Sequence, residues 1–476
     1  MNNHIEQALT DLRTRALKYE RPERYYNGEH DLKFATEKFE NTFGTLFREF
    51  ALNLCPVVCD AVRDKLRITG FSVDSIFAAG RNGERKGYAF PTSQINASGG
   101  SASKSGGIAA RELARSIWHR NRMRTRAGEV HKEALKTGDA YLIVWPDDLG
   151  RACLYPNRAA SISVAYDEDS LGRIAYAAKA WRTSDKHIRL NLLYPDRIER
   201  YISKEKSEGA LPEAKEFEPV GAASLRVPDR QAGSLRSDEA VIPNPYGVVP
   251  VFHFANNADL GTYGRSELEA AIPVQDGLNK SVLDMLVAME YSAFRQRWVA
   301  GIEVDYDAEG KAISPFKNGI DNLWVAGKDA RFGDFEAAQL DQFLLVKDSF
   351  RVDIASVTGT PLHYFLQQVG EFASGESLKQ SGTRFLAKVR DRQESFGQVW
   401  ADAMSFALRI EGNPGTQLLT EWEDPSPMTE RERLENLLLK RQLGLPVEQA
   451  LIEAGYGVAD VKQISNRRDA ETERKI

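Results

Sequence analysis

Residues 264–294 read GRSELEAAIPVQDGLNKSVLDMLVAMEYSAF, and this stretch decides the fold. The pattern predicts a helix of about 45 Å, in which Pro273 favours a kink or a late start. A polar insert follows at 295–339. Residues 340–357 then predict a returning helix, which Gly359 stops. The two helices should therefore form an antiparallel pair that carries the insert at its tip.

Both predicted helices are apolar over a wide part of their surface. The first carries Ile272, Val274, Leu278, Val282, Leu283, Met285, Leu286 and Met289, and the second carries Phe343, Leu344, Val346, Phe350 and Ile354. A helix that is apolar on more than one face must be buried on more than one side. The second side is covered either by the core of a monomer or by the same helix pair in a neighbouring copy.

The rest of the chain predicts a mixture of helices and antiparallel strands, so the fold class is α+β. Helical spacing is found at 5–19, where Arg21-Pro22 should end the helix, and at 41–69, before a strand that starts at Gly70. Further helices are predicted at 108–118, 123–137, 375–410, 429–444 and 446–455. Alternating β-formers predict a meander with strands at 140–145, 153–155, 161–166, 175–181, 189–194 and 197–201, and a further strand at 248–254. The stretches 93–107 and 203–239 are expected to be a flexible loop and a mobile polar insertion.

Composition excludes several classes of protein. The 476 residues are 42% hydrophobic and carry a formal charge of -5, from 63 basic and 68 acidic side chains, which disfavours a tight phosphate grip. The three cysteines indicate a reducing compartment without a disulfide framework. We expect no signal peptide, because the N-terminus lacks a basic-then-apolar pattern. No run approaches the roughly 20 apolar residues of a membrane span.

The motifs of catalysis are absent from the sequence. There is no phosphate-binding loop, no Gly-x-Gly-x-x-Gly, no nucleophile elbow and no His-Glu-x-x-His. Cys55 and Cys59 lie one helical turn apart and could hold a metal or form a redox pair, but two small apolar residues on a buried helix face is the favoured interpretation. Asp147-Asp148 fits a hairpin turn. We therefore expect no enzyme, no catalytic residues, no cofactor and no metal.

Several segments, taken together and in order, resemble the portal proteins of tailed bacteriophages, and most closely those of siphophages that infect Gram-positive and actinobacterial hosts. The segments are GDAYLIVW (138–145), GRSEL (264–268), QDGLNK (275–280), MEYSAF (289–294), QRW (296–298), IASVTGTP (354–361), SGESLK (374–379) and FGQVW (396–400). Each is weak alone, but the set extends over most of the chain. The stretches 93–107 and 203–239 depart from the family, so nothing is carried over to them.

The resemblance implies a ring of identical subunits, usually a dodecamer, at one vertex of the capsid. Double-stranded DNA would be packaged and ejected through the channel of the ring. The partners implied are a terminase, then a head-tail adaptor, and the major capsid and scaffolding proteins, with assembly in host cytoplasm and no membrane. The implied parts are a wing (1–262), stem helix 1 (263–294), a small α/β clip (295–339), stem helix 2 (340–358), a tunnel loop region (359–374), the long wing helix and linker (375–424) and a helical crown (425–476).

Candidate contact residues follow from these parts. The polar side chains Gln367, Gln368 and Glu371 should lie in the tunnel loop, where DNA slides past without being held. Lys280 and Lys347 on the stem are candidates for loose phosphate contact. The simpler interpretation of each lysine is a surface charge that is solvated or salt-bridged. In the clip, Trp324 and Phe332 would face a partner protein or fill a small β core.

Two other classes of protein stay open at this point. A DNA-processing enzyme such as a terminase subunit would need an ATPase or nuclease site, and its sequence motifs are missing. A capsid-shell or minor structural protein would need none. An ATPase or nuclease assay on the pure protein decides on the enzyme. A measured mass separates a shell protein from a portal, because a portal forms a closed ring and a shell protein forms capsomers or shells.

Overall fold

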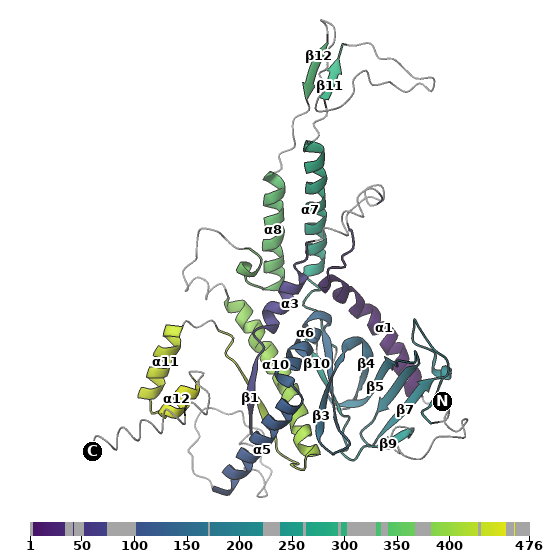
Figure 1. The fold of residues 1–476 in the computed structure, drawn as a ribbon, viewed down its shortest axis with the longest axis vertical. Helices are drawn as coiled ribbons and strands as arrows, with labels where there is room; N and C mark the ends of the chain where they lie inside the picture. The colour runs from purple at the N-terminus through teal and green to yellow at the C-terminus, as the bar shows by residue number, and fades with distance from the viewer. Residues whose placement is uncertain are drawn as a thin grey trace. The chain divides into compact units, whose positions relative to one another are not determined.

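The computed structural model describes residues 3–33, 41, 52–73, 101–169, 172–221, 239–259, 263–293, 297–301, 330–334, 341–366, 382–426, 430–453 and 461. Figure 1 shows a mixture of helices and strands. Two compact units are formed, one by Met1–Phe372 with Ala387–Glu423 and one by Ala373–Leu386 with Asp424–Ile476. The mixed α and β content predicted from the sequence is confirmed. Within the described residues, no helix is both long enough and apolar enough for a membrane crossing.

The first unit holds the strands and most of the helices. Its helices are α1 (Asn3–Tyr26), α3 (Cys55–Arg63), α5 (Ser101–Arg120), α6 (Met123–Thr137), α7 (Ala271–Ala293), α8 (Asp341–Thr358) and most of α10 (Thr383–Ile410). Its strands are β1 (Ile68–Val73), β2 (Asp139–Pro146), β3 (Ala152–Arg158), β4 (Ile162–Tyr166), β5 (Ile174–Arg182), β6 (Ile188–Leu193), β7 (Arg197–Ser203), β8 (Phe217–Pro219), β9 (Val241–Pro243), β10 (Val251–Ala255), β11 (Arg297–Ala300), β12 (Arg331–Asp334) and β13 (Leu418–Trp422). The second unit contains α11 (Glu430–Gln442) and α12 (Val447–Glu453).

All strand pairs described are antiparallel. Part of the predicted meander is present as the order β4-β5-β6-β7-β8, with β9 also paired to β7. The strands predicted at 140–145 and 153–155, β2 and β3, do not belong to it, because β2 pairs with β10 instead. A second sheet has the order β10-β2-β3, and its β2–β3 hairpin turns at Asp147, whose carboxylate accepts from the backbone N–H groups of Leu149 and Arg151. This is the turn role predicted for Asp147.

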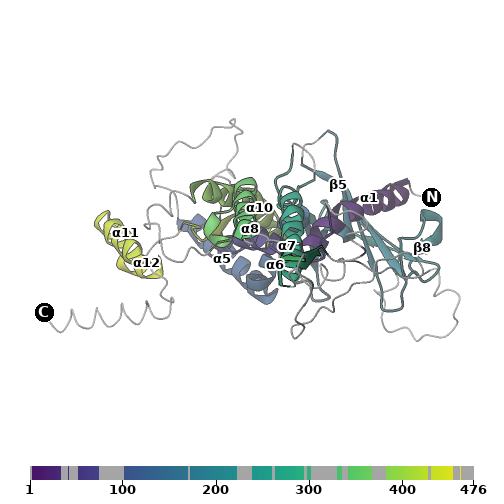
Figure 2. The same ribbon diagram turned by 90° about the horizontal axis from the view of Figure 1, so that it is seen from above.

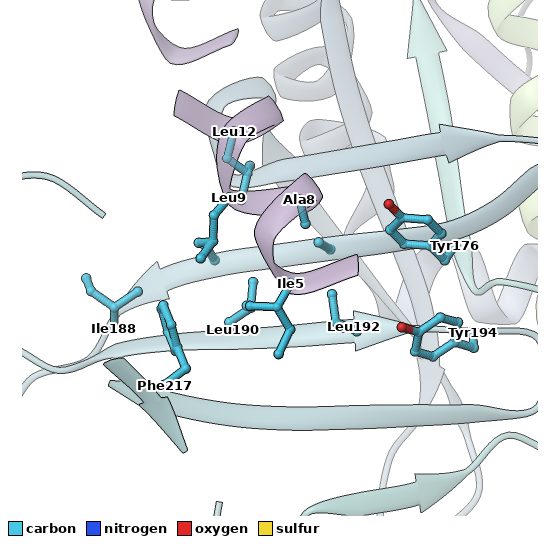
Figure 3. Close-up of a cluster of buried hydrophobic side chains, with 12 residues drawn as sticks. Ile5, Ala8, Leu9, Leu12, Tyr176, Ile188, Leu190, Leu192, Tyr194 and Phe217 are labelled. Atoms are coloured by element: carbon cyan, nitrogen blue, oxygen red, sulfur yellow. The ribbon is translucent and has the colours of Figure 1, made fainter. Parts of the chain in front are cut away.

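Helix α1 covers one face of the meander (Figure 3). Ile5, Leu9 and Leu12 point from the helix toward Leu190 and Leu192 of β6, and each is at most 4% exposed. Removing this much apolar surface from water is the main stabilisation of the contact. Tyr176, Tyr194 and Phe217 close the ends of the cluster.

Helix α10 is held in the first unit by an aromatic core. The indole of Trp400 is fully buried and its Nε1–H donates to Nε2 of His131 on α6 at 2.8 Å. Burial lowers the pKa of His131 to about 3, so the ring is neutral and can accept this bond. Trp118 of α5 and Phe254 of β10 lie against the same indole, with ring centroids 5.1 and 4.8 Å away. One side chain therefore joins α5, α6 and β10 to α10.

A buried carboxylate, Asp139, joins the N-terminal helix, the β10 strand and the segment that leads into α7. Its Oδ2 accepts from the Tyr19 hydroxyl at 2.7 Å, and its Oδ1 accepts from His253 Nε2 at 2.8 Å and from the backbone N–H of Gly264 at 2.7 Å. Tyr166 contacts Nδ1 of the same histidine at 2.5 Å. Asp139 has no exposed surface, so it fixes three parts of the chain at one point.

Two predicted helix ends are wrong. Pro22 does not stop α1, which continues to Tyr26. A proline inside a helix costs about 3 kcal/mol, but here the next turn buries Tyr25 completely, and its hydroxyl donates to Asp276 at 2.6 Å. The helical region predicted at 41–69 ends at Arg63 within the described residues, and Ile68 already belongs to β1. The reason is β13, a strand the sequence did not predict, which pairs with β1.

Two segments that were predicted to be loops contain regular structure, and one helix starts later than its full predicted range. The loop at 93–107 is helical from Ser101 on, because the buried stripe of α5 propagates the helix backward; residues 93–100 lie outside the described part. The insertion at 203–239 contains β8, since Phe217 fills the cluster under α1. Helix α7 begins at Ala271 and not at Gly264, which is the late start that Pro273 favours.

Candidate functional site

The candidate site is the antiparallel pair formed by α7 and α8. Figures 1 and 2 show the two helices side by side, with the β11–β12 pair following α7 in the chain and preceding α8. Gly277 allows the close approach, because a Cβ at this position would lie 2.9 Å from Cε1 of Phe350 on α8. Gly359 takes φ +65° directly after α8, which is the helix stop predicted for it.

Replacing Gly277 by alanine should weaken this pairing. Overpacking against Phe350 costs about 1–3 kcal/mol, more than the roughly 1 kcal/mol that alanine gains over glycine in a helix. Gly128→Ala on α6 is the matched control, because its added Cβ meets nothing within 4 Å. Thermal unfolding followed by circular dichroism should give a lower Tm for Gly277→Ala and an unchanged or higher Tm for Gly128→Ala. Equal shifts in both variants would contradict the close approach.

The start of α7 is anchored by three buried polar side chains. Gln275 donates to the carbonyl of Leu52 at 2.6 Å, and its Oε1 accepts from the N–H of Leu54 at 2.9 Å. Asp276 accepts from the Tyr25 hydroxyl, and burial raises the pKa of this carboxyl. Asn279 contacts His30 at 2.9 Å. The spacing i, i+1, i+4 of these amide and carboxyl groups was the signal in the sequence for an anchor.

A buried ionic cluster ties the segment before α7 and the end of α8 to α10. Lys388 lies 2.5 Å from Glu267 Oε2 and donates to the carbonyl of Thr358, the last residue of α8, at 3.0 Å. Arg392 contacts Glu267 Oε1 at 3.0 Å. Burial alone raises the pKa of Glu267, but Lys388 and Arg392 outweigh it, so the pKa lies below its ordinary value. No pattern in the sequence predicted this cluster.

Beyond these anchors the pair exposes apolar surface. Leu278, Val282 and Leu283 in the first half of α7 are buried, as is Ile354 near the end of α8. The rest of α8 is different. Its exposed apolar side chains are Leu344 (47%), Leu345 (73%), Val346 (43%) and Val352 (45%), with Val357 (47%) nearer the end of the helix. Single exposed apolar residues are ordinary, but a row of them on one helix marks a surface that packs against something else. We call these five residues the α8 face.

The structure describes only some of the predicted contact residues, and no ion pair or strand pairing joins those that it describes. Lys280 lies on α7 and forms a salt bridge with Asp284, four residues further along the helix. This matches the simpler interpretation of Lys280 as a salt-bridged surface charge. Lys347 is half-buried on α8 and forms no ion pair with any described residue. Phe332 lies on β12, where its backbone pairs with Val299 of β11. The predicted residues Gln367, Gln368, Glu371 and Trp324 lie outside the described part of the chain.

The cysteines follow the favoured interpretation. Cys55 and Cys59 are both buried on α3, and burial raises the pKa of Cys55 to about 12 and that of Cys59 well above its ordinary value. A thiol with such a pKa is a poor nucleophile and a poor metal ligand. In the described ranges, no three His, Cys, Asp or Glu side chains are grouped so that they could hold a metal ion.

Comparison with known proteins gives one family match and two curated relatives. The family model for "Phage portal protein, SPP1 Gp6-like" matches residues 91–476. The portal protein of Mycobacterium phage L5 is 29% identical over 271 residues, which covers 52% of this chain and 55% of the relative. The portal protein of Mycobacterium phage D29 is 27% identical over 266 residues, covering 52% and 54%. This chain thus spans about half the length of the curated relatives it matches.

Among solved structures, the chain is similar to one described as the neck of a native GTA particle computed with C12 symmetry, with a TM-score of 0.41, 13% identity and coverage of 70% of this chain and 80% of that chain. A second, from the virion of a native gene transfer agent particle, has a TM-score of 0.38 and 13% identity, and covers 74% and 89%.

Proposed function

The chain belongs to the family of SPP1 Gp6-like phage portal proteins, and we propose that it assembles into the ring-shaped channel at one capsid vertex through which double-stranded DNA is packaged and later ejected. In this role the ring docks a terminase during packaging and a head-tail adaptor afterwards. The protein acts as a structural conduit in the virion and not as an enzyme.

The observation that carries this proposal is the α8 face. One side of α8 is covered by α7, while Leu345 and Val352 point away from it and remain 73% and 45% exposed. A head-to-tail contact between identical copies supplies a second helix pair for this face, and repetition of that contact closes a ring when the rotation allows it. Leu345 and Val352 lie seven residues apart on one side of the helix, so their burial against a neighbouring copy would give each contact a hydrophobic core.

The parts of the chain receive the roles that the family implies. We assign α7 and α8 to the stem, the segment 295–339 with β11 and β12 to the clip that meets the terminase or adaptor, and 359–374 to the tunnel loop. Residues 1–262 and 375–424 form the wing, and 425–476 form the crown. The pairing of Lys280 with Asp284 favours a channel that lets DNA slide, because a neutralised lysine grips phosphate weakly.

A double variant, Leu345→Glu with Val352→Glu, should abolish the ring. The two carboxylates would face the apolar surface of the neighbouring subunit without a partner, which costs far more than one contact contributes. The matched control is Leu149→Glu with Val241→Glu, because these residues are 74% and 51% exposed elsewhere in the chain. Native mass spectrometry should give a closed oligomer for the wild type and the control, and a monomer for the α8 variant.

Other outcomes would refute the proposal. A wild-type protein that stays monomeric at every concentration is not a portal subunit. Capsomers or shells in place of a closed ring would indicate a capsid protein, and ATPase or nuclease activity of the pure chain would indicate an enzyme of packaging.

A further inference from the structure

The corner where α5 meets α6 is strongly basic, although the whole chain is acidic. Residues 111–126 contain six arginines and one glutamate, against a net charge of -5 for all 476 residues. The apolar side of the corner is buried through Ala114, Ile117, Met123 and Ala127. Five of the six arginines are exposed, so most of this charge faces solvent.

Three of the six arginines are held by contacts with described parts of the protein, and the other three are not. Arg111 and Arg120 pair with Glu421 and Glu411 and so join the corner to the rest of the unit, and Arg126 donates to the carbonyl of Leu154. Arg115, Arg122 and Arg124, by contrast, are exposed and form no ion pair with any residue in the described ranges. We call these three residues the arginine patch.

The backbone at the centre of the patch is unusual. Arg122 precedes α6 with φ +53°, in the left-handed region that residues other than glycine and asparagine rarely adopt. Asn121 stands directly before it and takes a different role, since its side chain bonds to Ile117 and Leu154. A glycine would adopt this conformation without strain, whereas the sequence has an arginine at this exposed position.

The chemistry of the patch selects the partner. Unpaired guanidinium groups bind phosphate oxygens through paired N–H donors. Ile108, seven residues before Arg115 on α5, is 60% exposed, but none of the large apolar side chains that the structure shows exposed falls within 111–126. One apolar side chain at the edge of the surface does not form the hydrophobic centre of a typical protein interface. A row of phosphates at regular spacing needs no such centre.

We propose that the arginine patch at the α5–α6 corner binds the phosphate backbone of duplex DNA, as a contact surface separate from the lysines on α7 and α8. This inference rests on the proposed portal function, because it identifies the ligand as the packaged genome. The binding is independent of base sequence, since it uses phosphates alone.

The test is the salt dependence of duplex binding by the full-length chain. A fluorescent 30-base-pair duplex is titrated at several NaCl concentrations, and binding is followed by anisotropy. The variant Arg115→Gln/Arg122→Gln/Arg124→Gln should bind at least tenfold more weakly, and its plot of log affinity against log salt should be shallower by about 2 to 3, from about 0.9 per phosphate contact. Replacing the same three arginines by lysine should restore most of the slope.

The control removes three charges from another surface: Lys186→Gln/Lys206→Gln/Lys215→Gln, all exposed on the meander side. The salt dependence of duplex binding by this control should equal that of the wild type. An equal loss of duplex affinity in both triple variants would mean that net charge alone drives binding, and it would overturn the inference. The inference would also be overturned if the arginine variant showed the same salt dependence of duplex binding as the wild type. Native mass spectrometry on the same samples separates the two proposals. If the arginine variant loses the ring but binds the duplex as the wild type does, the patch is a subunit contact and the inference is wrong. If the wild-type chain forms no ring but its duplex binding still depends on the patch, only the portal function is contradicted.

Discussion

Replacing Asp139 by alanine is expected to lower the free energy of unfolding by about 3–5 kcal/mol, because the change leaves three donors without an acceptor. The donors are the Tyr19 hydroxyl, the His253 Nε2–H and the Gly264 N–H, and the carboxylate that binds them has no exposed surface. Water cannot replace the lost acceptor at such a buried position without opening the structure. No other carboxylate described joins α1, β10 and the segment before α7 in this way.

Two comparison variants make this result specific. Asp139→Asn keeps the shape but can accept through one atom only, so we expect a smaller loss than for alanine. Asp148→Ala, in the exposed hairpin turn, should change stability by less than about 0.5 kcal/mol. Guanidinium unfolding followed by tryptophan fluorescence measures all three. If Asp139→Ala unfolds at the same denaturant concentration as Asp148→Ala, the buried carboxylate does not hold the unit together.

Local patterns in the sequence predicted the elements of the fold where a single segment carries its own signal. Helix α6 was predicted with its observed bounds, since Gly138 ends it with φ +104°. The meander strands β4 to β7 were predicted because short β-forming segments recur at regular spacing along this part of the chain. The resemblance to portal proteins was likewise confirmed by the family match, since it used several ordered segments at once.

The sequence failed where distant segments decide the outcome. Strand β13 has an ordinary composition and exists because β1 lies beside it, about 350 positions earlier in the chain. The length of α1 depends on Asp276, which accepts from Tyr25 across a separation of 251 residues. Pro22 is a local signal to stop, but a buried tertiary contact outweighs it. Propensity is a weak guide where such contacts compete with it.

The candidate site divides in the same way. The apolar surface of α7 and α8 was visible in the sequence, and with it the need for a second partner. The polar groups that hold the pair in place were not, because Glu267, Lys388 and Arg392 look like ordinary surface charges until the fold buries them. Asn256, which also donates to Glu267 at 3.2 Å, gave no signal at all.

Glu267 gives the second prediction with a large effect. Glu267→Gln should lower the free energy of unfolding at pH 7 by about 3–5 kcal/mol, because it leaves Lys388 as a buried cation without a carboxylate and leaves Arg392 with Asp391 alone. The side chains concerned are 9%, 16% and 6% exposed, so water does not compensate. Glu269→Gln, two residues along the same segment and exposed, should change stability by less than about 0.5 kcal/mol.

A double-mutant cycle separates the ion pair from the general cost of each change. Lys388→Met alone leaves Glu267 with Arg392 and also removes the bond to the carbonyl at the end of α8. If the pair interacts directly, the double variant Glu267→Gln/Lys388→Met should lose clearly less than the sum of the two single losses. Additive losses would mean that the two side chains do not act on each other.

The pH dependence of Glu267→Gln follows from the depressed pKa of Glu267. A carboxyl whose pKa is lower in the folded than in the unfolded protein contributes stability above the unfolded value, about 4.3, and loses that contribution as the pH falls through the folded value. The stability gap between wild type and Glu267→Gln should therefore be widest near neutral pH and should shrink below about pH 4.3, because only the wild type loses this carboxylate on acidification. Urea unfolding between pH 3 and 7 measures the gap. A gap that stays constant across this range would show that Glu267 is not held as a carboxylate by Lys388 and Arg392, and the anchor that joins α7 and α8 to α10 would have to lie elsewhere.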